Sequence, residues 1–285
     1  MNWTTLVSAP ELASQLGAPA LRIVDARFVL AGADADAGEK AWRLAHLPGA
    51  GYVHLDRDLS DHGKSAPQGR HPLPEADAFC ATLERLGISP DCQVVVYDAA
   101  DGAMAAARFW WLLKLLGHQR VAVLDGGFAR WSALALPVEH DQPAVRHGSY
   151  HASYDANAIA TTDGVAQRLD QSPGWLLDAR AAERFRGDVE PLDRVAGHIP
   201  GALNRPYSEN MAAGCFRSAE TLRQQFTALL HGREPRDVVL SCGSGVTACH
   251  NLLAMEHAGL HGARVYAGSW SGWISEPDRP VATGD

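Results

Sequence analysis

Residues 238–248 read V-V-L-S-C-G-S-G-V-T-A, and this stretch determines how the second half of the chain is interpreted. The apolar run predicts a buried strand, and the glycines that follow Cys242 predict a short loop opening into a helix. A cysteine in such a loop faces free backbone N–H groups and the positive end of the helix dipole, and both favour a thiolate. A small buried core cysteine is the plainer interpretation. The flanking glycines and the strand-to-helix position favour a nucleophile instead.

The same order of sequence blocks occurs twice along the chain. The matched pairs are I-V-D-A-R (23–27) with L-L-D-A-R (176–180), A-H-L-P-G-A (45–50) with G-H-I-P-G-A (197–202), V-V-V-Y-D-A (94–99) with V-V-L-S-C-G (238–243), and L-D-G-G-F-A-R-W (124–131) with Y-A-G-S-W-S-G-W (266–273). A repeat of this length predicts two tandem domains rather than a solenoid. Asp98 occupies the position of Cys242 in the first copy, and a carboxylate cannot act as a soft nucleophile. We therefore expect the first domain to be catalytically silent.

Length and composition agree with two globular domains. The chain has 285 residues, of which 46% are hydrophobic and 20% are charged. A formal net charge of −8 argues against nucleic acid as a main partner. No apolar stretch approaches the roughly 20 residues that span a bilayer, and the N-terminus lacks the pattern of a signal peptide. We expect no membrane association.

The cysteines and histidines indicate a reducing compartment without a metal site. The five cysteines are scattered and show no C-x-x-C spacing, and the 13 histidines show no H-E-x-x-H pattern. We therefore expect a cytoplasmic protein that needs neither a metal nor another cofactor.

Alternation of short β-branched runs with helical stretches predicts an α/β fold with a parallel sheet in each half. The expected strands are 21–25, 94–97, 121–124, 175–178, 238–241 and 263–266, and the clearest helices are 103–116 and 246–258. The polar segment 139–157 is interpreted as a linker between a domain at 1–140 and a domain at 155–285. Residues 56–74 lack periodicity and predict a long surface loop, a place where function is often found.

Two other chemistries fit the cysteine loop less well. The pattern G-x-G-x-x-A at 243–248 also occurs in dinucleotide-binding loops, but no acidic residue follows the next strand to hold a ribose. A cysteine phosphatase needs an arginine six positions after the nucleophile, where this chain has Ala248. A regulatory or structural tandem domain remains an alternative.

The repeat, the D-A-R and G-H-I-P-G-A blocks, the cysteine loop and the terminal G-S-W-S-G-W resemble the rhodanese sulfurtransferases over nearly the whole chain. Within that family, the loop at 242–247 is similar to the loop of 3-mercaptopyruvate sulfurtransferases. Members specific for thiosulfate typically carry a basic pair after the cysteine. The resemblance implies two tandem rhodanese-like α/β domains, an active site at their interface and a persulfide on Cys242.

The resemblance also implies which side chains act with Cys242. Family members bring an aspartate and a histidine from the first domain toward the serine of the loop. The matching residues here are Asp58, His71 and Ser244. A histidine held by an aspartate would poise the serine for proton transfer to the departing enolate. The backbone of Gly243, Gly245, Val246 and Thr247 is expected to surround the sulfur as an anion nest.

Arginines are the expected anchors for an anionic donor. By position in the family pattern, Arg184 is the first substrate arginine and Arg194 is the second, with Arg186 as the alternative for the second. Each of these arginines can instead form a surface ion pair. Arg180, at the end of the D-A-R block, is expected to hold the loop at the strand end.

The resemblance implies that Cys242 takes sulfane sulfur from 3-mercaptopyruvate, releases pyruvate, and passes the sulfur to thioredoxin, a small thiol or cyanide. One alternative is a thiosulfate:cyanide sulfurtransferase. The other, from a different class, is a sulfur carrier or regulatory protein with little turnover.

Replacing Cys242 with serine should abolish sulfur transfer, because a hard oxygen of much higher pKa cannot hold sulfane sulfur. Single substitutions of Cys80, Cys92, Cys215 and Cys249 should retain it. Mass spectrometry after donor treatment should find one added sulfur on the peptide that contains Cys242. Added sulfur only on another cysteine would contradict this assignment.

Overall fold

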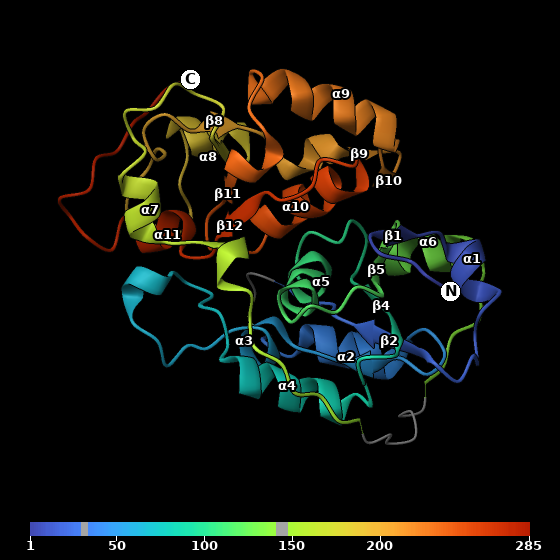
Figure 1. Cartoon of the computed structure of the whole chain (residues 1–285). Helices are drawn as coiled ribbons and strands as arrows, with labels where there is room; N and C mark the ends of the chain where they lie inside the picture. The colour runs from blue at the N-terminus through green and yellow to red at the C-terminus, as the bar shows by residue number, and fades with distance from the viewer. Residues whose placement is uncertain (30–33, 141–147) are drawn as a thin grey trace. The chain divides into compact units, whose positions relative to one another are not determined.

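The computed structural model describes residues 1–29, 34–140 and 148–285, and these residues form two compact units (Figure 1). The first unit comprises Met1–Asp61, Pro74–Asp155 and Ala213–Phe216. The second comprises His62–Leu73, Ala156–Ala212 and Arg217–Asp285. The chain therefore leaves the first unit at residue 62 and returns to it at residue 74. The segment 62–73, which contains His71, packs with the second half of the sequence. The expected linker covers residues 139–157. Its residues 141–147 lie outside the described part of the chain.

Each unit is built on a five-stranded sheet in which every neighbouring pair of strands is parallel. The strand order of the first sheet is β1-β5-β4-β2-β3, formed by Leu6–Val7, Val121–Leu124, Gln93–Tyr97, Leu21–Asp25 and Gly51–Tyr52. The second sheet has the equivalent order β6-β12-β11-β7-β8, formed by Ile159–Ala160, Arg264–Tyr266, Val239–Ser241, Leu176–Asp178 and Leu203–Asn204. The strands β9 (Met211–Ala212) and β10 (Cys215–Phe216) lie outside both sheets. The predicted α/β fold of two tandem domains with parallel sheets is confirmed.

Helices connect the parallel strands, as crossover connections require. In the first unit they are α1 (Ala9–Ala13), α2 (Ala37–Leu44), α3 (Leu55–Asp58), α4 (Ala76–Arg85), α5 (Ala106–Leu115) and α6 (Gly127–Ala133). In the second they are η1 (Ala66–Gln68), η2 (Ala156–Ala158), α7 (Thr162–Ala166), α8 (Ala182–Arg186), η3 (Tyr207–Asn210), α9 (Ala219–Leu230), η4 (Pro235–Asp237), α10 (Ala248–His257) and α11 (Ser269–Trp273). The apolar helix α5 packs on β4 and β5, and the equivalent helix α10 packs on β11 and β12.

The apolar side chains of each half form a separate core. Trp131 is fully buried in the first core, with aliphatic residues from the surrounding strands and from α1. Trp175, Trp270 and Trp273 are fully buried in the second. Burying side chains of this size is the main favourable contribution to the stability of each unit.

The D-A-R block closes the end of its strand in the same way in both units. Arg27 pairs with Asp25 at 2.7 Å and Arg180 pairs with Asp178 at 2.7 Å, and all four side chains are buried. Each arginine also donates to the carbonyl oxygen of the residue before the histidine of the next repeated block. The expected structural role of Arg180 therefore matches its contacts.

No helix in the described part of the chain is long and apolar enough to cross a membrane.

Candidate active site

Cys242 lies in the turn between β11, which ends at Ser241, and α10, which begins at Ala248. Its residue surface is only 1% exposed. The backbone N–H of Gly245 donates to its sulfur at 3.1 Å, and the hydroxyl of Ser269 lies 4.0 Å from the same sulfur. Thr247 is the N-cap residue of α10, so the loop that holds Cys242 leads directly into that helix.

The segment 267–273 fixes the cysteine loop through its backbone. The N–H of Cys242 donates to the Ser269 hydroxyl at 3.1 Å. The N–H groups of Trp270 and Ser271 donate to the carbonyls of Cys242 and Gly243 at 3.0 and 2.9 Å. The G-S-W-S-G-W motif thus binds the loop from the far end of the sequence.

Gly245 is required by both its conformation and its surroundings. Its φ is +78°, and a Cβ at this position would lie 2.4 Å from the carbonyl oxygen of Ala267. No side chain fits such a distance to backbone. Any side chain at position 245 is therefore incompatible with this loop geometry.

Ser244 and His71 form a direct pair. The Nδ1 atom of His71 lies 2.7 Å from the Ser244 hydroxyl, and the two residues are 4% and 6% exposed. The ring of His62 approaches the ring of His71 edge-on, with 6.0 Å between centroids. A buried imidazole and a hydroxyl at this distance can pass a proton between them.

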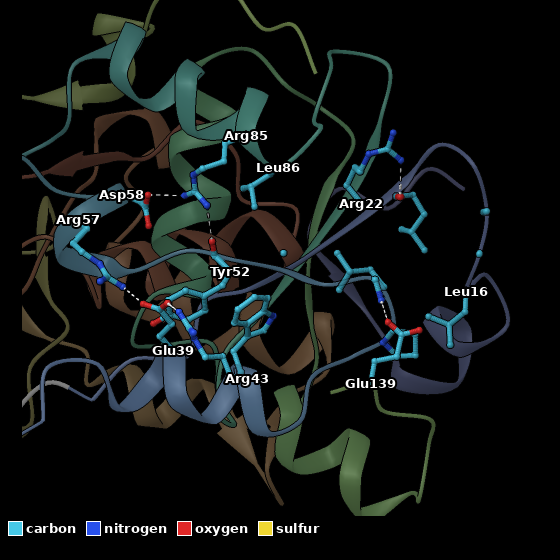
Figure 2. Close-up of a pocket in the computed structure, with 18 residues that line it drawn as sticks. Leu16, Arg22, Glu39, Arg43, Tyr52, Arg57, Asp58, Arg85, Leu86 and Glu139 are labelled. Atoms are coloured by element: carbon cyan, nitrogen blue, oxygen red, sulfur yellow. Dashed lines mark hydrogen bonds and ion pairs between the residues drawn. The ribbon is translucent and has the colours of Figure 1, made fainter. Parts of the chain in front are cut away.

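Asp58 has its contacts within the first unit. Its two carboxylate oxygens accept from the N–H of His54 at 2.7 Å and from Arg85 at 2.6 Å. It lines a pocket of about 910 Å³ in which Arg43 and Arg57 both pair with Glu39 (Figure 2). The structure therefore gives Asp58 local partners, and its action on His71 stays a prediction.

Arg184, in α8, lies beside the cysteine loop. Its guanidinium donates to Glu190 at 2.7 Å and to Asp193 at 3.2 Å, and both of its terminal nitrogens would lie 3.6 Å from a Cβ on Gly243. A second arginine, Arg70, was not predicted from the sequence and also lies beside Gly243. Nη2 of Arg70 would lie 3.3 Å from the same Cβ position. The adjacency of Arg70 to His71 was the one sequence signal that could have suggested it.

The other two predicted arginines contact different groups. Arg194 donates through Nη2 to the backbone carbonyl of Ile274. Arg186 pairs with Asp188 at 2.8 Å at the surface, the alternative already considered for it. Val246 is buried and Thr247 half-buried in the loop after the cysteine. Residues 1–29, 34–140 and 148–285 contain no group of three or more His, Cys, Asp or Glu side chains placed to hold a metal ion.

Neighbouring charges and hydrogen bonds set the pKa values of Arg180 and Glu190 near the loop. Burial lowers the pKa of Arg180, but the nearby charges of Asp178, Glu190 and Cys242 outweigh burial and raise it. Burial likewise favours the neutral form of Glu190, yet hydrogen bonds from Arg184 and from backbone N–H groups keep its pKa below the usual value. Both groups are therefore charged at neutral pH.

Comparison with known proteins identifies the family. The model of the rhodanese-like domain matches this sequence twice, over residues 8–134 and 161–276. The chain belongs to the rhodanese family. Among its rhodanese relatives, a probable 3-mercaptopyruvate sulfurtransferase from Pseudomonas aeruginosa is 45% identical, with all of both chains covered. A putative thiosulfate sulfurtransferase from Mycobacterium tuberculosis is 41% identical over 98% of this chain and 97% of the relative.

Solved structures of rhodanese proteins agree with this result. The crystal structure of SseA from Escherichia coli, a 3-mercaptopyruvate sulfotransferase of rhodanese fold, matches with a TM-score of 0.80. The two are 31% identical, and the match covers 94% of this chain and 99% of SseA. The 3-mercaptopyruvate sulfurtransferase of Leishmania major matches with a TM-score of 0.82 at 30% identity, over 96% of this chain and 76% of that protein.

Replacing Gly245 with alanine should disrupt the cysteine loop, because the added Cβ would collide with the carbonyl of Ala267. Gly259 is the matched control: its φ is +77°, but nothing lies within 4 Å of the Cβ position. Gly259→Ala should cost about 1–2 kcal/mol from the left-handed backbone alone. Gly245→Ala should cost about 3 kcal/mol or more. Urea unfolding measures both, and equal losses would contradict the close approach.

Proposed function

We propose that this protein is a 3-mercaptopyruvate sulfurtransferase in which Cys242 carries the transferred sulfur. The observation that supports this most directly is the arrangement in one loop of a cysteine sulfur held by the Gly245 N–H and a serine hydroxyl held by His71. The names of relatives at 45% identity and of neighbours in solved structures support the same donor. Asp98 leaves the first unit without an equivalent nucleophile, and we propose that this unit is catalytically silent.

In the proposed first half-reaction, the Cys242 thiolate attacks the thiol sulfur of 3-mercaptopyruvate. A sulfur–sulfur bond forms and the carbon–sulfur bond of the donor breaks. The electron pair of that bond stays on the donor's methylene carbon, so the leaving group is the enolate of pyruvate. The backbone donors of the loop stabilise negative charge on the cysteine sulfur before attack and on the persulfide after it.

Ser244 and His71 supply the proton that the enolate needs. In this proposal the hydroxyl gives its proton to the departing enolate and takes one from the imidazolium form of His71, 2.7 Å away; the Cys242 thiol proton, lost when the thiolate forms, balances this proton. Arg184 binds the donor carboxylate, since a guanidinium matches the planar geometry of a carboxylate. Asp58 completes the set in this proposal by orienting His71.

In the second half-reaction an acceptor attacks the outer sulfur of the persulfide and restores the Cys242 thiolate. A thiol acceptor such as thioredoxin or a small thiol leaves with an added sulfur, and cyanide leaves as thiocyanate. The five cysteines are all free thiols. A persulfide enzyme that works with thiol acceptors requires a reducing environment, so we propose a cytoplasmic location.

Steady-state rates with 3-mercaptopyruvate and with thiosulfate, measured with one acceptor, test the donor. We expect kcat/KM to be at least about tenfold higher for 3-mercaptopyruvate, because Ser244 is a neutral donor where a dianion gains from cations. A preference for thiosulfate would favour the function named for the Mycobacterium tuberculosis relative. Labelling of Cys242 without turnover on either donor would favour a sulfur carrier.

Ser244→Ala and His71→Ala should each lower kcat with 3-mercaptopyruvate by roughly 10²–10⁴-fold, since each breaks the same proton transfer. The double variant should be little worse than either single variant, because residues that act as a unit are not additive. His261→Ala, at an exposed histidine paired with Glu256, is the control and should retain activity. Fully additive losses would show that Ser244 and His71 act separately.

A further inference from the structure

Four arginines of the second unit lie where the strands of its sheet begin, and we call them the edge arginines: Arg168, Arg233, Arg236 and Arg264. Arg264 is the first residue of β12, and η4, which contains Arg236, shortly precedes β11. Arg168 and Arg233 donate to the segment 171–173, which leads into β7. Because β7, β11 and β12 are parallel, these positions share one edge of the sheet. Cys242 follows the opposite end of β11, so this edge is not the edge of the cysteine loop.

Two of the edge arginines are held by neutral groups rather than by carboxylates. The guanidinium of Arg168 stacks over the ring of Trp175, with 4.6 Å between its Cζ and the ring centroid. Its Nη2 donates to the backbone carbonyl of Asp237 at 2.7 Å. Nη2 of Arg233 donates to the carbonyl and the hydroxyl of Ser172 at 2.6 and 2.8 Å. Both guanidinium groups are thus positioned while they keep their full charge.

The other two edge arginines lie close together and have fewer contacts. The Nε atom of Arg264 is buried, and no group in the described part of the chain accepts its hydrogen. A Cβ on Gly262, two residues earlier, would lie 3.3 Å from the Cβ of Arg236. A buried N–H without an acceptor is costly, so it requires an acceptor from outside the chain.

Ion pairs do not balance the charges of the edge arginines. No carboxylate in the described part of the chain forms an ion pair with any of the four. Other arginines of the same unit are paired, among them Arg180, Arg184 and Arg205. The acidic residues of the neighbouring loops, Asp170 and Glu234, are exposed to solvent. This edge therefore carries a local excess of positive charge on a chain whose formal net charge is −8.

Repulsion between the edge arginines acts on Arg168. Burial lowers the pKa of its guanidinium, and the charge of Arg264 lowers it further. Asp237 raises this pKa and Arg233 lowers it again. The guanidinium stays charged at neutral pH, because the ordinary pKa of arginine is so high. A bound anion would replace repulsion between neighbouring cations with attraction to a shared partner.

We propose that the edge arginines bind a phosphate group, as free phosphate or as a phosphate ester. Guanidinium N–H groups match the oxygens of a phosphate, and one dianion accepts from several of them at once. A single carboxylate carries only one charge and would leave most of the cluster unbalanced. The site lies at the other edge of the sheet from Cys242, so it does not rest on the proposed function.

Calorimetric titration of the full-length protein tests the site and distinguishes the two sources of phosphate. Inorganic phosphate and glycerol phosphate are the probes, each at constant ionic strength in a chloride buffer, and the tighter of the two identifies the source. Arg236→Gln and Arg264→Gln should each weaken binding of the tighter probe by about tenfold. Arg223→Gln, at an exposed arginine of α9 paired with Glu220, is the control and should leave binding unchanged.

Two results of the titration would overturn the assignment. One is the absence of binding of either probe to the unaltered protein. The other is equal weakening by all three variants, because that pattern means attraction to the net surface charge alone. Tighter binding of a glutamate-rich peptide than of both phosphate probes would reject a phosphate ligand in favour of an acidic protein partner.

Thermal unfolding separates phosphate binding from a structural role of the same arginines. Without phosphate, Arg236→Gln should unfold at the same temperature as the unaltered protein or at a higher one, because it relieves repulsion between cations. With excess phosphate the unaltered protein should gain more stability than the variant, since a ligand stabilises the folded state in proportion to its occupancy. Equal destabilisation of Arg236→Gln with and without phosphate would show a structural role and contradict the proposal.

Discussion

The close approach of Gly245 to the backbone of Ala267 is the constraint on which the second unit's site depends. A Cβ on Gly245 would lie 2.4 Å from the Ala267 carbonyl, and the N–H of the same residue donates to the sulfur of Cys242. The same segment, 267–273, then binds the loop backbone on one side. On the other side, Ser271 and Gly268 meet the chain at residues 69 and 70. The cysteine loop and residues 69–70 therefore contact the same short stretch of backbone.

The first unit has the same loop framework but fills it with its own side chain. The N–H groups of Phe128 and Ala129 donate to the carbonyls of Asp98 and Ala99, as their counterparts do beside Cys242. The Asp98 carboxylate, however, accepts from five backbone N–H groups that follow it, at 2.9–3.5 Å. An anion nest occupied by a buried internal carboxylate has no room for an external anion. In this copy the loop keeps the same backbone contacts, and the side chain of Asp98 accepts the N–H groups of the loop.

The ion pairs around the cysteine loop differ in how deeply they are buried. The inner pair, Arg180 with Asp178, is almost fully buried and closes the end of β7. Glu190 links this pair to Arg184, because its two oxygens contact both arginines. The outer pairs, Arg70 and Arg184 with Asp193, are more exposed on the arginine side. A fully buried ion pair such as Arg180–Asp178 is costly to break, because each charge would lose its partner without gaining water. A partly exposed guanidinium can instead exchange a carboxylate partner for another anion.

The sequence by itself determined the two-fold repeat, the parallel α/β architecture and the loop that holds Cys242. The expected strands at 21–25 and 121–124 coincide with β2 and β5, and those at 94–97 and 238–241 differ from β4 and β11 by one residue. The expected helix at 246–258 differs from α10 by two residues at its start and one at its end. These features are local: apolar periodicity and glycine placement specify them within about ten residues.

Only the tertiary structure decided which side chains meet. His71 and Ser244 are 173 positions apart, and Arg70 and Asp193 are 123 apart. The segment 62–73 has no periodicity of its own, so its sequence does not say that it leaves one unit to pack on the other. Likewise, nothing in the local sequence distinguishes an arginine that contacts Gly243, such as Arg70, from one that contacts Ile274, such as Arg194. Contacts between residues so far apart depend on the path of the folded backbone and on which charges are buried together. A short window of sequence contains neither kind of information.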